Sequence, residues 1–272
     1  MHRGPIVNEG GFVAVDIGNS TAGLAVEKEG EFVAHSVSLK TAEWTSECLR
    51  WAHRTLDCGK ICWLISSVRP TASHHLIERI SDSTGHDTHQ VTHADVPMEL
   101  MVDSPDRLGI DRLLAAYATK QLIRPPFAIA DIGSAITVDW VDQLGHFCGG
   151  AILPGLSLQA ESLHRWTEAL PNLNAAPNLG VETDPTLQLP GRNTADAIRA
   201  GILVGAAGAI EALAARYSDP AVPCSIVLTG GQADLIAPHL EQNPSLLPNL
   251  VCRGLLELPR SKGNAETKTE VL

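Results

Sequence analysis

The sequence predicts an α/β protein built from two related halves. Residues 12–32 align with residues 127–147 at an offset of 115, with seven identities in 21 positions and no gap. Each copy reads as an apolar strand, the tripeptide Asp-Ile-Gly, a second apolar strand, a charged turn with glycine, and a returning aromatic residue. Apolar runs of strand and helix length alternate through the rest of the chain. A duplicated half-domain explains these observations better than two unrelated hairpins.

The first half is predicted to contain a meander, a buried strand and a helix. The meander covers residues 11–34. Residues 61–68 are continuously apolar before they end in small hydroxyl residues, which indicates a buried strand. Residues 111–123 place apolar side chains at helical spacing behind an N-terminal acid.

The second half repeats the meander and then continues with helices and one more strand. Residues 157–169 have the pattern of an amphipathic helix, and either Asn193 or Thr194 can cap a long Ala- and Gly-rich helix that runs to about Tyr217. Residues 225–229 read as a last core strand. The expected boundaries are residues 11–124 for the N-terminal half, 125–256 for the C-terminal half and 257–272 for a flexible polar tail.

Composition excludes some classes of partner. The 272 residues include 20 Lys and Arg against 31 Asp and Glu, a net charge of −11, so a protein that coats nucleic acid is not expected. Aromatic residues make up only 4%, too few for a platform that stacks single-stranded bases. We therefore expect no nucleic-acid partner.

The sequence also predicts a cytoplasmic protein with no membrane segment. The longest uncharged apolar stretch near the C-terminus is residues 200–210, whereas a membrane span needs about 20 residues. Asp16 interrupts the N-terminal apolar run, unlike in a signal peptide. The six cysteines are scattered, which favours reduced thiols. Cys58 and Cys62, like the His86, His89 and His93 group, have spacings that a metal could use, although a solvated loop explains the histidines more simply.

Two acidic turns carry the clearest chemistry. Asp16 and Asp131 each end a strand at an Asp-Ile-Gly turn, so two facing halves would place them on opposite walls of one cleft. Carboxylates hold hard cations such as Mg²⁺ directly or through water, and glycine-flanked turns let backbone N–H groups approach phosphate. The alternative is a pair of hairpin turns that each use an aspartate structurally. Neither a phosphate-binding P-loop nor G-x-G-x-x-G occurs.

Two further motifs lie at predicted helix starts. Asp111 and Arg112 stand side by side in Leu-Gly-Ile-Asp-Arg. They fit either an acid favoured by the helix macrodipole or a general base beside an anion-binding arginine. Thr194, in Gly-Arg-Asn-Thr, fits either a helix cap or a contact to an anionic ligand.

Together these motifs resemble those of type III pantothenate kinases. The resemblance covers residues 12–232 and includes D-I-G-N-S, S-S-V-R-P, L-G-I-D-R, D-I-G-S-A-I-T-V-D, G-G-A-I-L-P-G-L and G-R-N-T-A-D-A-I-R-A-G, in the family's order. It implies duplicated ribonuclease-H-like halves of the actin-like ATPase type, each a mixed sheet with flanking helices, with a cleft between them. The implied activity is ATP-dependent phosphorylation of pantothenate, the first step towards coenzyme A.

The resemblance also implies roles for individual residues. Asp111 would be the base that takes the proton from the pantothenate hydroxyl, with Gly109, Ile110 and Arg112 lining the substrate site. Thr194 would contact pantothenate and Ser134 would bind ATP. The residues of the first phosphate-binding turn would be Asp16, Ile17, Gly18, Asn19, Ser20, Thr21, Ala22 and Gly23.

Cofactors and assembly follow from the same resemblance. Mg²⁺ would accompany the nucleotide near Asp16, through water, and Asp131 would bind a monovalent cation, K⁺ or NH₄⁺. The chain would form a homodimer. Ser20 and Ser134 stand where the family mostly has threonine, and residues 98–104 lack the family's usual aromatic residue. Two alternatives remain open: a non-catalytic accessory protein related to transcription, and a kinase for another small hydroxy substrate.

Overall fold

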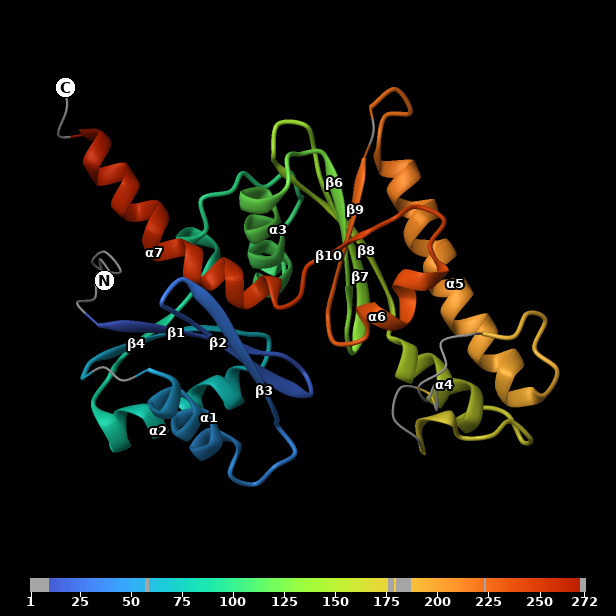
Figure 1. Ribbon diagram of the computed structural model, residues 1–272, viewed down its shortest axis with the longest axis horizontal. Coiled ribbons are helices and arrows are strands. Elements are labelled where there is room, and N and C mark those ends of the chain that lie inside the picture. Colours follow the sequence, from blue (N-terminus) through green and yellow to red (C-terminus); the bar gives the residue numbers. More distant parts are fainter. Residues whose placement is uncertain (1–9, 57–58, 176–178, 180–186, 223, 270–272) are drawn as a thin grey trace. The chain divides into compact units, whose positions relative to one another are not determined.

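The computed structural model describes residues 10–56, 59–175, 179, 187–222 and 224–269 (Figure 1). It divides into two compact units. Unit 1 comprises Met1–Met98, Asp103–Leu122 and Asn249–Leu272, and unit 2 comprises Glu99–Val102 and Ile123–Pro248. The C-terminal residues thus group with the N-terminal unit, which differs from the expected division at residues 124 and 256.

Unit 1 contains a five-stranded mixed sheet in the order β3-β2-β1-β4-β5. The first three strands form the predicted antiparallel meander, and β4 and β5 add in parallel beside β1. Its strands are β1 (Gly11–Ile17), β2 (Thr21–Lys28), β3 (Glu31–Ser38), β4 (Ile61–Ser67) and β5 (Asp87–Gln90).

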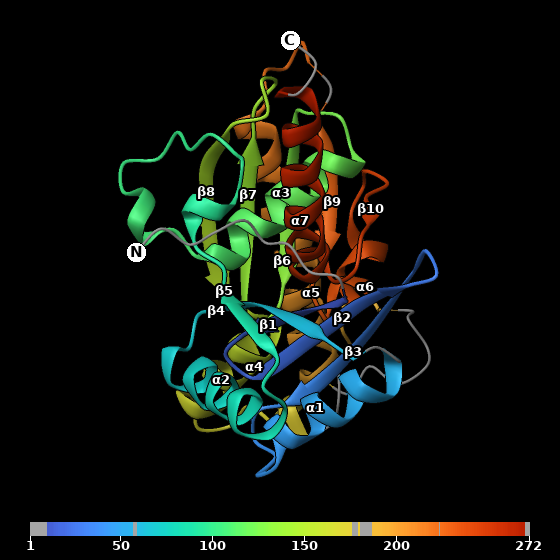
Figure 2. The ribbon, with the colours of Figure 1, turned by 90° about the vertical axis from the view of Figure 1, so that its left-hand side faces the viewer.

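Helices cover both faces of this sheet. Alternate residues of β1, including Val13 and Val15, pack with Leu49 and Leu76 in one core beneath the helices α1 and α2. The helices α3 and α7 lie over the opposite face in both views (Figures 1 and 2). The bounds are α1 (Trp44–Thr55), α2 (Pro70–Thr84), α3 (Ile110–Leu122) and α7 (Leu250–Thr269), with short 3₁₀ turns η1 (His93–Asp95) and η2 (Pro105–Arg107).

Unit 2 repeats the topology of unit 1. Its sheet has the order β10-β9-β6-β7-β8, so β6, β7 and β8 form a second antiparallel meander and β9 and β10 add in parallel beside β6. This equivalence confirms the predicted duplication. The strands are β6 (Phe127–Ile132), β7 (Ala135–Val141), β8 (Phe147–Pro154), β9 (Ser225–Thr229) and β10 (Ser245–Leu246).

The longest helix of unit 2 packs into its core. Helix α5 (Thr194–Tyr217) begins at the N-cap residue Asn193 and buries Ile202, Leu203 and Ile210 against the sheet. Within the described part of the chain, α5 alone is long and apolar enough to cross a membrane by length and composition. A helix buried in a protein core meets the same criteria of length and composition. The other elements are α4 (Leu156–Arg165), η3 (Leu173–Ala175), α6 (Ala233–Ile236) and η5 (Ala237–His239).

Three details differ from the sequence-based expectations. Helix α4 ends at Arg165 rather than near residue 169. Residue 89 lies in a strand rather than in a loop. Helix α7 occupies residues 250–269, where we expected a flexible tail from residue 257, because Leu255 and Leu258 are buried within unit 1.

Candidate active site

The first acidic turn follows β1 in unit 1. Asp16 is half-buried and lies opposite Gly23 in the β1–β2 pair. Beyond it, the Gly18 N–H donates to the carbonyl oxygen of Thr21 at 3.0 Å, which closes the turn. Asn19, Ser20 and Thr21 are exposed. The turn therefore presents polar side chains to solvent immediately beyond a partly buried carboxylate. Ile17 and Ala22 are buried behind them.

Two neighbours support the Asp16 carboxylate. Ser66 pairs with Asp16 across β1 and β4, is fully buried, and donates from Oγ to Asp16 Oδ1 at 3.3 Å. Cys252 of α7 is also buried there. Burial first, and then the negative charge of Asp16, raise the pKa of the Cys252 thiol well above its usual value. Cys252 is therefore a neutral packing group beside Asp16 and not a nucleophile.

An arginine that sequence reasoning did not select lies on the same turn. Arg69 Nη1 donates to the carbonyl oxygen of Asn19 at 3.1 Å. Its backbone is fixed by Ser67, whose Oγ accepts from the Arg69 N–H at 2.9 Å, and by the Val68 N–H, which donates to Ile17 O at 3.2 Å. A guanidinium group thus lies beside the exposed donors of the turn. The only sequence signal was the motif S-S-V-R-P itself.

The second acidic turn follows β6 in unit 2. Asp131 is half-buried and Ser134 is exposed, and the Gly133 N–H donates to Ala135 O at 3.0 Å. Two glycines allow this turn to pack closely. A Cβ at Gly155 would overlap the carbonyl oxygens of residues 133 and 134, and a Cβ at Gly230, whose φ is +91°, would overlap Asp131 Oδ1. Neither glycine was selected from the sequence.

The two acids occupy equivalent positions in the two sheets. Asp16 lies opposite Ser66 on the parallel neighbour β4, and Asp131 lies opposite Thr229 on the parallel neighbour β9. Both hydroxyl residues are buried. The repeat thus extends beyond the aligned three-stranded meander to a fourth strand, where sequence identity is lost.

The proposed base is held at the start of α3. Asp111 Oδ1 accepts from the backbone N–H of Arg112 at 2.9 Å, and both residues are half-buried. The carboxylate folds back over Gly109, because a Cβ at that position would overlap Asp111 Oδ1. Ile110 is buried behind them. A side chain at position 109 would therefore displace the Asp111 carboxylate from its observed position.

Thr194 lies at the first helical position of α5 and is exposed. The N-cap role belongs to Asn193, whose Oδ1 accepts from the Asp196 N–H at 2.9 Å. Arg199 then pairs with Asp196 at 2.9 Å. Because a neighbouring residue caps the helix, the Thr194 hydroxyl is not needed for that purpose.

The donor chemistry of the two acidic turns fits hard cations. Carboxylate and hydroxyl oxygens are the ligands that Mg²⁺ and K⁺ take in proteins. Among the described residues, no group of three or more His, Cys, Asp or Glu side chains is arranged to hold a metal. A cation at Asp16 or Asp131 would therefore take water or phosphate oxygens as its remaining ligands.

The other candidate metal groups do not come together. The His86 ring lies 5.2 Å from the His53 ring and is tilted against it by 39°, and His93 bonds to the carbonyl oxygen of Leu108. Burial raises the pKa of the Cys62 thiol to about 11, so this thiol is neutral, whereas a zinc ligand must be a thiolate. Cys58 lies outside the described residues.

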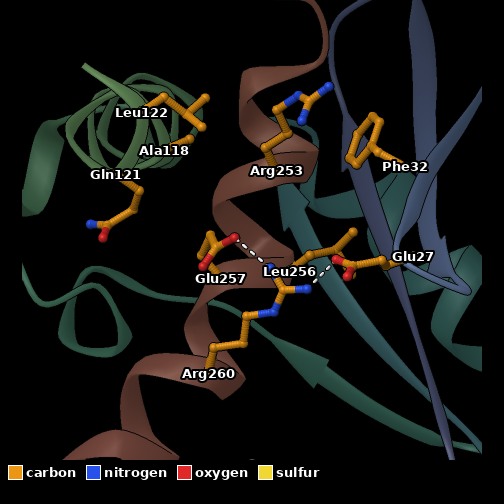
Figure 3. Close-up of a pocket in the computed structure, with 10 residues that line it drawn as sticks. Glu27, Phe32, Ala118, Gln121, Leu122, Arg253, Leu256, Glu257 and Arg260 are labelled. Carbon is orange, nitrogen blue, oxygen red and sulfur yellow. Dashed lines mark hydrogen bonds and ion pairs between the residues drawn. The ribbon is translucent and has the colours of Figure 1, made fainter.

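A pocket of about 220 Å³ in unit 1 is not part of this site (Figure 3). It includes Glu27 and lies at the end of β2 remote from Thr21, six residues or about 20 Å along the strand. Arg260 bridges Glu27 and Glu257, and the Arg253 guanidinium lies 4.0 Å from the centre of the Phe32 ring. These charged side chains therefore already interact with other groups of unit 1.

Comparisons with solved structures identify the fold to which the two duplicated sheets belong. The structure of the activator of the 2-hydroxyisocaproyl-CoA dehydratase from Clostridium difficile, with bound ADPNP, is similar with a TM-score of 0.51 and 14% identity, over 96% of this chain and 98% of that one. The ethanolamine utilization protein EutJ from Carboxydothermus hydrogenoformans gives a TM-score of 0.50 and 14% identity, over 94% and 91%. At such identities the likeness shows the fold alone. The duplicated sheets thus define a protein of the actin-like ATPase and sugar-kinase fold.

The family follows from sequence similarity. A family model for type III pantothenate kinase matches residues 12–216. The type III pantothenate kinase of Rhodopirellula baltica is 32% identical, over 90% of this chain and 97% of the relative, and that of Rhodospirillum rubrum is 31% identical over 91% and 97%. The chain belongs to the type III pantothenate kinase family, and it is therefore a phosphotransferase.

Proposed function

We propose that this chain transfers the terminal phosphoryl group of ATP to the primary hydroxyl of pantothenate, in the first step of coenzyme A synthesis. The observation that carries the proposal is the duplication itself. It places one half-buried aspartate at the same strand end in each unit, Asp16 beside Ser66 and Asp131 beside Thr229. A structural hairpin turn does not account for a half-buried aspartate opposite a buried hydroxyl residue at equivalent positions of both sheets.

Asp111 is the proposed general base. Its Oδ1 is engaged by the Arg112 N–H, and this leaves Oδ2 to take the hydroxyl proton of pantothenate as the oxygen attacks phosphorus. The positively charged guanidinium of Arg112, next to the base, pairs with the pantothenate carboxylate. Gly109, Ile110 and Thr194 complete the proposed substrate contacts.

The two turns are proposed to bind the nucleotide. Residues 16–23 and Ser134 offer backbone N–H groups and hydroxyls to phosphate oxygens, and Arg69 adds a positive charge on the first turn. Asp16 would hold Mg²⁺ through water, and Asp131 would hold K⁺ or NH₄⁺. These cations, when bound, offset the negative charge of the transferring phosphoryl group. A chain of net charge −11 needs such local positive charge to bind two anions.

We also propose that the protein is a cytoplasmic homodimer. One face of α5 supports the assembly: Gly201, Gly205 and Gly208 are exposed, and a Cβ built on any of them meets nothing within 4 Å. Helix faces of small residues allow the close approach of a second helix. The proposal predicts a dimer by light scattering in solution.

A coupled assay tests the activity. The purified chain is mixed with ATP, Mg²⁺ and pantothenate in the presence of either K⁺ or NH₄⁺, and ADP formation is followed together with the mass of the product. The proposal expects phosphopantothenate to form. Absence of turnover with both cations would overturn it in favour of a non-catalytic accessory role, whereas turnover of only a sugar or acetate would indicate another hydroxy substrate.

A further inference from the structure

Residues 86–93, which follow α2 and contain three histidines, form a hydrogen bond to the residues just before α3. His93 opens the η1 turn, and its Nε2 lies 2.7 Å from the carbonyl oxygen of Leu108, fifteen residues further along the chain. A carbonyl oxygen only accepts hydrogen bonds, so Nε2 carries the proton and donates it. Both residues belong to unit 1.

The Leu108 carbonyl lies just outside the helix that carries the proposed base. The first backbone bond of α3 runs from the Leu113 N–H to Gly109 O at 3.3 Å. The N–H of Arg112, four residues after Leu108, donates to Asp111 Oδ1 instead of to the Leu108 carbonyl. Leu108 is 9% exposed, and an unpaired carbonyl at such a depth is unfavourable. His93 supplies the hydrogen bond that the helix does not.

The turn that presents His93 is itself held in place by hydrogen bonds. Asp95 Oδ2 accepts from both the N–H and Oγ1 of Thr92 at 2.9 Å, which forms a capping box around η1. Asp95 Oδ1 lies 3.3 Å from His89 Nε2, and both side chains are mostly buried. The Val91 N–H donates to Ile65 O at 2.9 Å and ties the segment to β4. The turn that presents His93 is therefore anchored to the central sheet.

We propose that His93 is a positioning residue for Asp111. Its Nε2–H fixes the Leu108 carbonyl, and so it fixes the backbone at Gly109, over which the Asp111 carboxylate folds. Because Asp111 Oδ1 occupies the space that a Cβ on Gly109 would take, a movement of this backbone changes the surface against which the carboxylate lies. The proposal rests on the function proposed above, in which Asp111 is the base. No proton leaves His93, since both the neutral Nε2–H tautomer and the imidazolium donate this bond.

Two substitutions separate the hydrogen bond from packing. His93→Phe keeps a planar ring but removes the donor, whereas His93→Gln keeps an N–H donor at similar reach. A displacement of about 1 Å at a reacting group can cost about 10²-fold in rate, so we expect kcat of His93→Phe to fall by about 10- to 100-fold. The KM for ATP should change by less than about threefold, because the proposed nucleotide-binding turns lie outside this segment. His93→Gln should recover most of the lost kcat.

His75→Phe is the matched control, because His75 is exposed on α2 of the same unit, and it should retain wild-type kcat. Thermal melting of each variant checks that the fold is kept. A His93→Phe variant with wild-type kcat overturns the proposal. So does a His93→Gln variant as slow as His93→Phe, which would show that the donor is not what matters.

Hydrogen–deuterium exchange tests the same contact without any turnover. Peptides that cover residues 105–113 should exchange faster in His93→Phe than in wild type or His93→Gln. Unchanged exchange in His93→Phe would overturn the positioning role. Absence of pantothenate phosphorylation by the wild-type chain would instead overturn the proposed function, so the two failures are distinguishable.

Discussion

Ser66 Oγ donates to Asp16 Oδ1 at 3.3 Å from the neighbouring parallel strand of the same sheet. Ser66 is fully buried, and its partner in the β1–β4 pair is Asp16, one residue before the end of β1. In the second sheet, Thr229 occupies the corresponding position beside Asp131. A buried hydroxyl residue thus lies opposite the aspartate in both sheets, and in the first sheet the role of Asp16 can be tested through Ser66.

Ser66→Ala should weaken the use of Mg-ATP. The substitution removes one hydrogen bond to a charged group, a contribution of about 1.5 kcal/mol, so kcat/KM for Mg-ATP should fall by about tenfold. Steady-state kinetics with varied Mg-ATP measure it. Ser36→Ala, an exposed serine of β3 in the same sheet, should behave as wild type. Equal kinetics in the two variants would mean that Ser66 does not support a working Asp16.

Asp111→Asn should remove most of the turnover while the protein stays folded. The amide keeps the shape of the side chain but cannot take the proton, and a general base contributes about 10²- to 10⁴-fold to the rate. Single-turnover formation of phosphopantothenate is the measurement. Asp82→Asn, at an exposed position of α2, is the control. An unchanged kcat in Asp111→Asn would remove Asp111 from the role of base.

Arg69→Ala should act on ATP affinity more than on kcat. The substitution removes the guanidinium that holds the Asn19 carbonyl and the positive charge beside the turn. We expect KM for ATP to rise by about 5- to 20-fold, in line with about 1–2 kcal/mol for a charge-assisted contact, and KM for pantothenate to stay the same. Arg79→Ala, at an exposed position of α2, is the control because it removes the same positive charge at a different site. If both variants raise KM for ATP equally, a general effect of net charge is responsible.

Gly205→Glu should disrupt the proposed dimer. A charged side chain in the middle of the exposed glycine face of α5 would be desolvated if another copy packed there, but it costs little in a monomer because the space is open. Light scattering at several concentrations measures the change in mass. Gly59→Glu introduces the same side chain where a Cβ also meets nothing, but outside α5, and it should leave the mass unchanged.

Asp142→Asn should reduce stability in a pH-dependent way. Burial alone would raise the pKa of Asp142. The backbone N–H groups of His146 and Leu144 and the His146 imidazole lower the pKa by more than burial raises it, so the net pKa lies below its usual value. A lowered pKa contributes stability above the usual aspartate range, and this contribution is lost as the pH falls through the folded-state pKa. We expect the substitution to lower the free energy of unfolding by about 1 kcal/mol at neutral pH, and by progressively less in acid.

Urea denaturation at neutral pH and in mild acid measures this difference. Asp219→Asn, at an exposed position in the loop after α5, is a useful comparison because its Oδ1 also accepts a backbone N–H, that of Ala221, at 2.9 Å. A loss at Asp142 that stayed constant with pH would show that packing, not ionisation, is responsible.

The topology of the meander in each unit could be predicted from the sequence alone. The repeat around Asp16 and Asp131 predicted two related meanders, and both sheets have that topology. The helix predicted over residues 111–123 is α3 (Ile110–Leu122), because apolar periodicity is a local property. Of the two predicted cap candidates, Asn193 and Thr194, it is Asn193 that caps α5.

The residues around the two acidic turns, and the unit to which α7 belongs, became known only from the fold. Ser66, Arg69 and Gly230 reach the acidic turns through strand pairing over large sequence separations, and a single sequence does not encode such registers locally. Helix α7 joins unit 1 because its buried face needs a partner surface, and only the folded sheet provides one. His93 meets Leu108 for the same reason: the contact depends on where two separated turns are placed by the core between them.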